Sequence, residues 1–332
     1  MEINNRTVRL LERPFGFPKK NIWSFNEENF DLDLKKNELL VKNEYISIDP
    51  AMRGWLNKGK SYISPVSIGD VMRAGTIGVV VRSKNNFFKV GDYVSGWGGV
   101  QEYNINDGKN FNIIDDKKIN IKSYLSVLGM TGLTAYFGIL RVGEIKKSDT
   151  VVVSAAAGAV GSVVGQIAKI KGCKVIGIAG GSKKCDYVKN ILKFDDCIDY
   201  KSNNFFTNLK KSCKEGVDVY FDNVGGTILN QIMMFISKGA RIVICGAISQ
   251  YNQKPTGPNN YLSLLVNRAT MKGMVVFDYV DDYELAIKEM RKWILDKKLT
   301  TSEDIYEGIE NFHEIFLKLF SGEKIGKLIL KV

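Results

Sequence analysis

The stretch VVVSAAAGAVGSVVGQIAK, residues 151–169, determines the fold class of this 332-residue chain. A run of valines is followed by a turn and then by a segment of small residues, which predicts a strand, a tight turn and a helix. Gly158 and Gly161 have the spacing of the last two glycines of Gly-x-Gly-x-x-Gly, and Ala156 occupies the first position. Such a turn exposes backbone N–H groups at a helix N-terminus, where a dinucleotide pyrophosphate can approach. The same turn could also serve only close helix packing, so the surrounding pattern must decide.

Strands and helices alternate after this turn. The predicted strands are 151–153, 174–179, 217–222 and 240–246, and the predicted helices are 158–171, 184–192 and 227–237. This alternation indicates an α/β fold with a doubly wound parallel sheet, and it favours the dinucleotide-binding interpretation of the turn. Before about residue 122 the chain instead predicts short strands, at 7–12, 39–49, 76–83, 92–97 and 102–105. A helix at 282–298 and a strand at 326–332 complete the pattern.

The composition excludes several classes of protein. Its 45% hydrophobic and 25% charged residues are ordinary values for a folded globular chain, and at roughly 150 residues per domain the length allows about two domains. The single histidine, His313, cannot supply a multi-histidine zinc site, and a Ser-His-Asp arrangement would depend on it alone. Five cysteines without a Cys-x-x-Cys pair indicate neither a disulfide framework nor structural zinc. We therefore expect no bound metal and a reducing, cytoplasmic location.

The positive charge is spread along the chain. The net charge is +11, the lysines occur in doublets, and acidic residues are interleaved with them. This distribution indicates a lysine-rich solvated surface and no nucleic-acid partner. The N-terminus has no apolar signal core, and the uncharged windows 123–140 and 151–168 are interrupted by Gly, Ser, Thr or Gln. We therefore expect no export signal and no membrane span.

The segment after the second predicted strand distinguishes between the two nicotinamide cofactors. An NAD site places Asp or Glu there, about 20 residues after the glycines, to bind the ribose hydroxyls. This chain has Gly180-Gly181-Ser182-Lys183-Lys184 instead. With no carboxylate to repel a 2′-phosphate and two lysines to neutralise it, the segment predicts NADP. The alternative is that Lys183 and Lys184 are only a surface doublet.

The ends of the next two predicted strands carry further candidates. Asp222 and Asn223 follow one strand, and the segment Gly246–Tyr251, which contains Ile248, follows the other. Ligands of open α/β sheets lie just beyond the carboxyl ends of the strands, so these loops are expected to line the nicotinamide and ribose. Asp222 and Asn223 could equally cap the following helix.

Motifs along nearly the whole chain resemble one branch of the medium-chain dehydrogenase/reductase superfamily. They are IDPAMRG at 48–54, VMR at 71–73, LGMTGLTAY at 128–136, AAAGAVGSVVGQIAK at 155–169, FDNVGG at 221–226, CGAISQYN at 245–252 and Gly326-Lys327. The branch is that of the zinc-free, NADP-dependent 2-alkenal, prostaglandin and curcumin reductases. The resemblance implies a GroES-like catalytic domain of residues 1–122 with 300–332, a Rossmann NADP-binding domain of residues 123–299, and a homodimer.

The resemblance also implies roles for single residues. Tyr251 is similar to the branch's proton donor or carbonyl-polarising hydroxyl, and a tyrosine is protonated at neutral pH and able to donate. Tyr62 is similar to a second substrate-pocket tyrosine, although it could also be an aromatic lid. Lys184 and Tyr200 correspond to the pair that holds the 2′-phosphate, whereas Lys324 stands where the branch often has Asn. With the turn motif, the expected cofactor-binding residues are Ala156, Gly158, Ala159, Val160, Gly161, Gly180, Lys184, Tyr200, Asn223, Gly246, Ile248, Tyr251 and Gly326.

The expected activity is NADPH-dependent reduction of the C=C bond of α,β-unsaturated aldehydes and ketones. This reaction suits a chain without zinc ligands, because hydrogen bonds can stabilise the charge that develops on the carbonyl oxygen. Quinone reduction with the same cofactor is an enzymatic alternative. An alternative of another class is an NADPH-binding protein with little turnover that associates with RNA or another protein, as the charge of +11 could allow.

Overall fold

The structure is a computed structural model that describes residues 3–30 and 33–332. The chain forms two compact units, one of Met1–Leu125 with Glu303–Val332 and one of Ser126–Ser302. The domain limits expected from the sequence, after residues 122 and 299, lie near these borders. We call the first the β-rich unit and the second the α/β unit.

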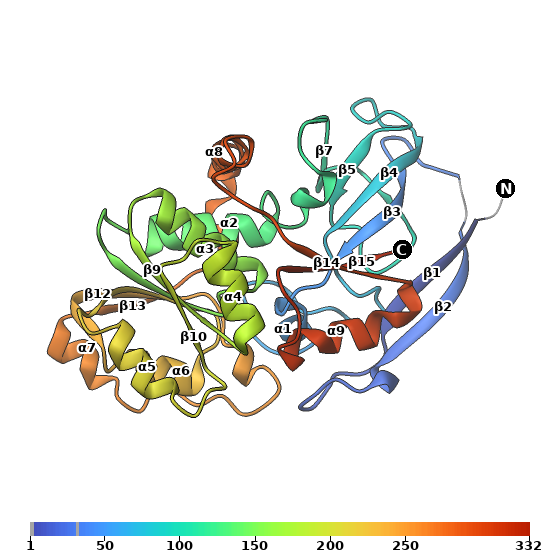
Figure 1. The fold of residues 1–332 in the computed structure, drawn as a ribbon. Coiled ribbons are helices and arrows are strands. Elements are labelled where there is room, and N and C mark those ends of the chain that lie inside the picture. Colours follow the sequence, from blue (N-terminus) through green and yellow to red (C-terminus); the bar gives the residue numbers. More distant parts are fainter. Residues whose placement is uncertain (1–2, 31–32) are drawn as a thin grey trace. The chain divides into compact units, whose positions relative to one another are not determined.

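The α/β unit is built on a six-stranded sheet whose neighbouring strands all run parallel (Figure 1). The strands are β8 (Thr150–Ser154), β9 (Lys174–Ala179), β10 (Asp196–Asp199), β11 (Val217–Asp222), β12 (Ile236–Ile244) and β13 (Thr270–Gly273). Their order in the sheet is β10-β9-β8-β11-β12-β13. The chain leaves β8 in one direction and later returns to its other side with β11, which makes the sheet doubly wound and of Rossmann type.

Helices cover both faces of this sheet, which explains its apolar strands. They are α2 (Met130–Phe137), α3 (Ala159–Ile170), α4 (Ser182–Asn190), α5 (Phe205–Ser212), α6 (Gly226–Ile232), α7 (Leu262–Asn267) and α8 (Tyr283–Leu295). Side chains of α5 and α6 share a core with one face, whereas α3 and α4 contact the other and α2 packs between α3 and α8. Val151, Val152 and Val153 are consequently all buried, as in strands covered on both sides.

The predicted fold class is confirmed, with corrections to single elements. Four elements have no counterpart among the predicted ones, namely β10, α5, α7 and β13. Strand β10 is only four residues long and reads DCID, without the alternation that predicts a strand. The helix predicted over 227–237 ends at Ile232, and β12 begins at Ile236. The boundary was missed because residues 232–236 form an uninterrupted apolar run without Gly or Pro.

The β-rich unit contains a seven-stranded sheet that joins the two ends of the chain. Its strands are β3 (Leu39–Ser47), β4 (Thr76–Ser83), β5 (Tyr93–Gly96), β6 (Tyr103–Asn106), β7 (Phe111–Ile113), β14 (Glu303–Glu307) and β15 (Lys327–Lys331). The C-terminal strand β15 pairs antiparallel with β3 and parallel with β14. The C-terminus therefore completes the sheet that the N-terminal part begins, which the periodicity of the sequence could not indicate.

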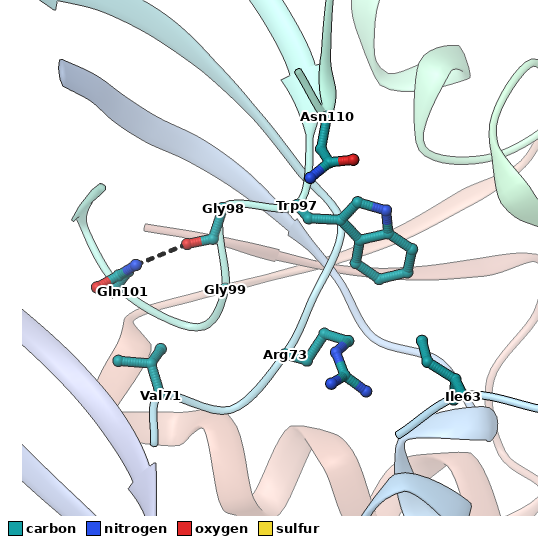
Figure 2. Close-up of a pocket in the computed structure, with 8 residues that line it drawn as sticks. All are labelled: Ile63, Val71, Arg73, Trp97, Gly98, Gly99, Gln101 and Asn110. Carbon is teal, nitrogen blue, oxygen red and sulfur yellow. Dashed lines mark hydrogen bonds between the residues drawn. The ribbon is translucent and has the colours of Figure 1, made fainter. Parts of the chain in front are cut away.

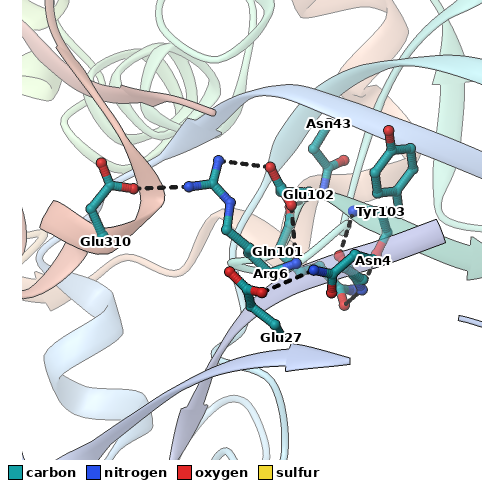
Figure 3. Close-up of polar contacts among 9 residues, drawn as sticks. Asn4, Arg6, Glu27, Asn43, Gln101, Glu102, Tyr103 and Glu310 are labelled. Carbon is teal, nitrogen blue, oxygen red and sulfur yellow. Dashed lines mark hydrogen bonds and ion pairs between the residues drawn. The ribbon is translucent and has the colours of Figure 1, made fainter. Parts of the chain in front are cut away.

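A two-stranded hairpin and two helices complete the β-rich unit. They are β1 (Ile3–Leu10), β2 (Trp23–Phe30), α1 (Ala51–Trp55) and α9 (Phe312–Ser321). Arg6 of β1 forms ion pairs with Glu102 at 2.8 Å and with Glu310 at 3.2 Å (Figure 3). The Asn5 Oδ1 accepts the Tyr103 N–H at 2.9 Å. These contacts fasten the hairpin to segments from both ends of the chain.

The only histidine has a packing role. His313 lies on α9, is buried, and accepts a hydrogen bond from the Trp23 Nε1–H at 3.2 Å through its Nδ1. Burial lowers the pKa of His313, which favours the neutral ring that this hydrogen bond requires. In the described ranges no helix has the length and apolar character needed to cross a bilayer.

A buried ion pair holds the C-terminal strand in place. The Lys327 Nζ on β15 donates to the Asp49 Oδ1 at 2.6 Å and to the Ile48 carbonyl at 2.9 Å, and the lysine side chain is only 1% exposed. Burial lowers the pKa of Lys327, and the Asp49 carboxylate opposes that shift.

We expect Lys327→Met to lower the unfolding free energy of the β-rich unit by roughly 3 kcal/mol, because the change leaves Asp49 without its cation. Urea unfolding followed by tryptophan fluorescence measures this, since Trp23, Trp55 and Trp97 lie in this unit. The control is Lys331→Met on the same strand, whose exposed pair with Glu307 should contribute less than about 1 kcal/mol. Equal losses in the two variants would contradict a special role for the buried pair.

Candidate functional site

The turn between β8 and α3 presents an open helix N-terminus. Gly158 is the N-cap of α3, no acidic residue lies in the first turn, and no side chain of the described residues caps it. A Cβ on Gly161 would lie 2.4 Å from the Ala155 carbonyl oxygen, so only glycine allows this tight turn. The backbone N–H groups of the first turn are left to bind an anion, and the helix dipole favours one.

This N-terminus lies where the doubly wound sheet places its ligands. It follows β8, and the strand order reverses between β8 and β11. The Ser154 Oγ at the end of β8 donates to the Asp222 Oδ1 at 3.0 Å, and the Asn223 Nδ2 donates to the Ser154 carbonyl at 2.8 Å. The carboxyl ends of the two central strands are therefore joined by side chains.

Asp222 orders the loop between β11 and α6. Its Oδ1 also accepts the backbone N–H groups of Val224 at 3.0 Å and Gly225 at 2.9 Å and the Tyr220 hydroxyl at 2.8 Å. Burial raises the pKa of Asp222, and its Oδ2 has no hydrogen-bond partner among the residues that the structure describes. These contacts order the loop that leads into α6. The N-cap of α6 is Gly225, and no side chain of the described residues caps this helix, so Asp222 shapes the loop and does not cap the helix.

A second corner of the α/β unit gathers the residues expected at the 2′-phosphate. Lys184 lies in the first turn of α4, whose N-cap is Gly181 and whose first turn contains no acidic residue. A Cβ on Gly180 would lie 2.8 Å from the Tyr200 ring, so this ring packs directly on the glycine backbone. The Asp199 Oδ1 accepts the N–H groups of Gly181 at 2.7 Å and of Lys201 at 2.9 Å, which ties the two loops together.

Lys201 is a member of this corner that the sequence did not indicate. Its Cε lies 3.1 Å from the position of a Cβ on Gly180, beside the Tyr200 ring. It was missed because it follows β10, the strand that the sequence pattern did not predict. The corner therefore combines a helix N-terminus with lysine side chains, which suits a dianionic phosphate.

The loop after β12 holds the candidate catalytic hydroxyl. The Ala247 N–H donates to the Tyr251 hydroxyl oxygen at 3.3 Å, and a Cβ on Gly246 would lie 2.8 Å from that oxygen. The Ile248 N–H donates to the Asn223 carbonyl at 3.2 Å. The structure thus brings Asn223, Gly246, Ile248 and Tyr251 together at one edge of the sheet.

Two of the expected site residues belong to the β-rich unit. Tyr62 lies in the loop between α1 and β4, and its side chain is 56% exposed. Gly326 immediately precedes β15 with a φ of +73°, and the Lys324 Nζ donates to its carbonyl at 3.3 Å. The expected site roles of Tyr62 and Gly326 stay predictions. Lys324 has a structural contact, its hydrogen bond to the Gly326 carbonyl.

The turn at α3 fits a dinucleotide, because its N-terminus is uncapped and a glycine is required where the diphosphate would approach. Among the residues described, no cluster of three or more His, Cys, Asp or Glu side chains is placed to hold a metal ion. A Rossmann-type unit with such a turn, next in the chain to a β-rich unit built from both termini, is the architecture of a two-domain dehydrogenase or reductase.

Comparison with known proteins defines this class further. Residues 6–114 match the family model described as the N-terminal domain of oxidoreductase, and residues 159–292 match the model described as zinc-binding dehydrogenase. The chain is 37% identical to the NADPH-dependent curcumin reductase of Escherichia coli, over 99% of this chain and 97% of that protein. It is 36% identical to the NADP(+)-dependent 2-alkenal reductase of Nicotiana tabacum, over 100% of this chain and 98% of that protein.

The solved structure of CurA from Vibrio vulnificus in complex with NADPH has the same fold, with a TM-score of 0.93 and 40% identity. The alignment covers 98% of this chain and 99% of that one. The chain therefore belongs to the zinc-free, NADP-dependent branch of the medium-chain dehydrogenase/reductase family.

Proposed function

We propose that the protein is an NADPH-dependent reductase of the C=C bond in α,β-unsaturated aldehydes and ketones and that it works without zinc. The observation that carries the proposal is that the Tyr251 hydroxyl and the open N-terminus of α3 lie at the same edge of one parallel sheet. The names of the 2-alkenal and curcumin reductases support the same substrate class. We assign cofactor binding to residues 123–299 and the catalytic domain to residues 1–122 with 300–332.

The residues fit NADPH in two places. The first turn of α3, residues 159–161, would bind the diphosphate, and the corner of Gly180, Lys184 and Tyr200 would bind the 2′-phosphate. Asn223, Gly246 and Ile248 would line the nicotinamide side of the sheet edge, and we assign Gly326 there as well. When bound, NADPH supplies the hydride that adds to the β-carbon of the substrate.

Tyr251 would stabilise the charge that then develops on the carbonyl oxygen, or deliver the proton. Its hydroxyl oxygen accepts the Ala247 N–H, and an accepted hydrogen bond strengthens the donation of the hydroxyl's own proton. We assign Tyr62 to the substrate pocket as a second tyrosine.

Substrate depletion tests the proposal. With a medium-chain trans-enone the protein should consume NADPH much faster than NADH and form the saturated ketone. Rapid NADPH consumption with a quinone and none with the enone would instead support the quinone reductase alternative. Tight NADPH binding without either turnover would support a binding protein.

We also propose that two copies associate through the β13 edge of the α/β unit. Strand β13 ends the sheet, and α7 beside it buries none of its residues in the described chain. Leu265 and Val266 on α7 are 73% and 65% exposed. A sheet edge flanked by exposed apolar side chains suits a two-fold interface. The cysteine pattern supports a cytoplasmic location.

Light scattering after gel filtration should therefore give twice the chain mass of 37.2 kDa. We expect Leu265→Asp to shift the protein to the monomer mass, because the charge would be buried at the interface. Phe87→Asp, a matched change at a side chain 82% exposed in the β-rich unit, should leave the dimer intact. A wild-type mass of one chain would contradict the proposal.

A further inference from the structure

A pocket of about 460 Å³ lies wholly within the β-rich unit. Ile63, Val71 and the indole of Trp97 supply apolar walls, and Arg73, Gln101 and Asn110 supply polar groups (Figure 2). This volume and this mixture of apolar walls with a few polar groups are typical of small-molecule sites.

The walls of the pocket are fixed before any ligand binds. The ring of Trp97 packs edge-on against that of Trp55, with 5.8 Å between the centroids. A Cβ on Gly98 would lie 2.3 Å from the Thr76 Oγ1, so the segment after β5 packs tightly against the start of β4. The Gln101 Nε2 donates to the Gly98 carbonyl at 2.8 Å (Figure 2). A preformed pocket of this kind loses little entropy on binding.

Arg73 is the only cation that lines the pocket in the described chain, and it lacks a carboxylate partner. Its Nη1 donates to the Ser64 carbonyl at 2.8 Å, and its guanidinium lies 5.6 Å from the centroid of the Trp55 ring. No ion pair joins Arg73 to any described Asp or Glu, whereas Arg6 and Arg9 of the same unit are each paired at less than 3 Å. Burial lowers the pKa of Arg73, and Asp70 opposes this shift only at a distance.

A guanidinium has five N–H donors, and the described residues supply a hydrogen-bond acceptor, the Ser64 carbonyl, to only a minority of those of Arg73. A carboxylate accepts two of them in parallel and neutralises the charge, which a neutral ligand cannot do. The apolar walls at the same time favour a hydrocarbon or aromatic body attached to that carboxylate.

We propose that this pocket binds the carboxylate of an amphipathic acid through Arg73. The pocket then selects for acids over esters or amides of the same length.

Calorimetry with octanoate and octanamide tests the binding step in the absence of cofactor. The wild-type protein should bind octanoate at least about 10-fold more tightly than octanamide, which corresponds to one charge-assisted hydrogen-bond pair. In Arg73→Gln the two affinities should become equal while octanamide binding stays as it was, and Arg73→Lys should restore part of the preference. Equal affinities in the wild type, or an unchanged preference in Arg73→Gln, would overturn the proposal.

Asn110→Asp provides a second variant, because Asn110 is an exposed pocket residue whose replacement should not disturb folding. The added negative charge should weaken the binding of octanoate and leave the binding of octanamide unaffected. Unchanged octanoate binding in Asn110→Asp would contradict the proposal that the carboxylate binds in this pocket.

Discussion

Replacing Lys184 with alanine is expected to raise the KM for NADPH by about 10- to 100-fold and to change the KM for NADH by less than about threefold. Lys184 lies in the first turn of α4, near Gly180, on which the Tyr200 ring packs. Hydrogen bonds between a lysine and a phosphate contribute roughly 1.5–3 kcal/mol, and only NADPH carries the 2′-phosphate. Initial rates with each cofactor at a saturating enone concentration measure the effect.

Lys189→Ala is the matched control, because Lys189 lies in the last turn of the same helix. That variant should behave as the wild type with both cofactors. Lys201→Ala should raise the KM for NADPH alone, by a smaller factor than Lys184→Ala, if the lysine found only from the structure shares the phosphate. Equal effects of Lys184→Ala on NADPH and NADH would remove the 2′-phosphate assignment.

Tyr251→Phe is expected to lower kcat by about 100-fold and to leave NADPH affinity within about twofold of the wild type. The phenylalanine ring can keep the packing above Gly246 and loses only the hydroxyl that the Ala247 N–H binds. Losing one donor to a developing oxyanion typically costs two to three orders of magnitude in turnover. Steady-state rates give kcat, and quenching of protein fluorescence by NADPH gives the affinity.

Tyr62→Phe serves as the comparison for this variant. A substrate-pocket tyrosine that donates a hydrogen bond should show a raised KM for the enone, whereas an aromatic lid should tolerate the loss of its hydroxyl. An unaltered kcat in Tyr251→Phe would contradict the assignment, and water or the cofactor ribose would then have to supply the proton.

The α/β fold can be predicted from the sequence alone because the residue patterns that indicate it lie within short segments of the chain. The valines at 151–153 and the glycines that follow predict the strand, the turn and the helix within 19 residues. The lysine doublet at 183–184 follows where an NADP site is expected to have a positive charge. The same reasoning missed β10, whose four residues have no clear alternation, and with β10 it missed Lys201. Tyr200 was found only through the family resemblance.

The features that depend on distant segments were the hardest to foresee. Lys327 belongs to one of the sequence motifs, but its burial against Asp49 results from the return of β15 to β3, across 278 residues of sequence. The Arg73 pocket has no local signature, since its walls come from segments near residues 63, 72, 98 and 110. Such sites arise when a sheet brings separated loops together, and spacing along the chain does not report them.

The fate of a deuterium label tests the central claim most directly. With NADPH that carries deuterium at the transferable position of the nicotinamide and a trans-enone in ordinary water, the saturated ketone should carry one deuterium on its β-carbon and a solvent proton on its α-carbon. Mass spectrometry and NMR of the product locate the label. Deuterium on the carbonyl carbon of an unsaturated alcohol would show carbonyl reduction, and an unlabelled, unreduced enone would show that the protein is no enone reductase. Either result would contradict the function proposed for this chain.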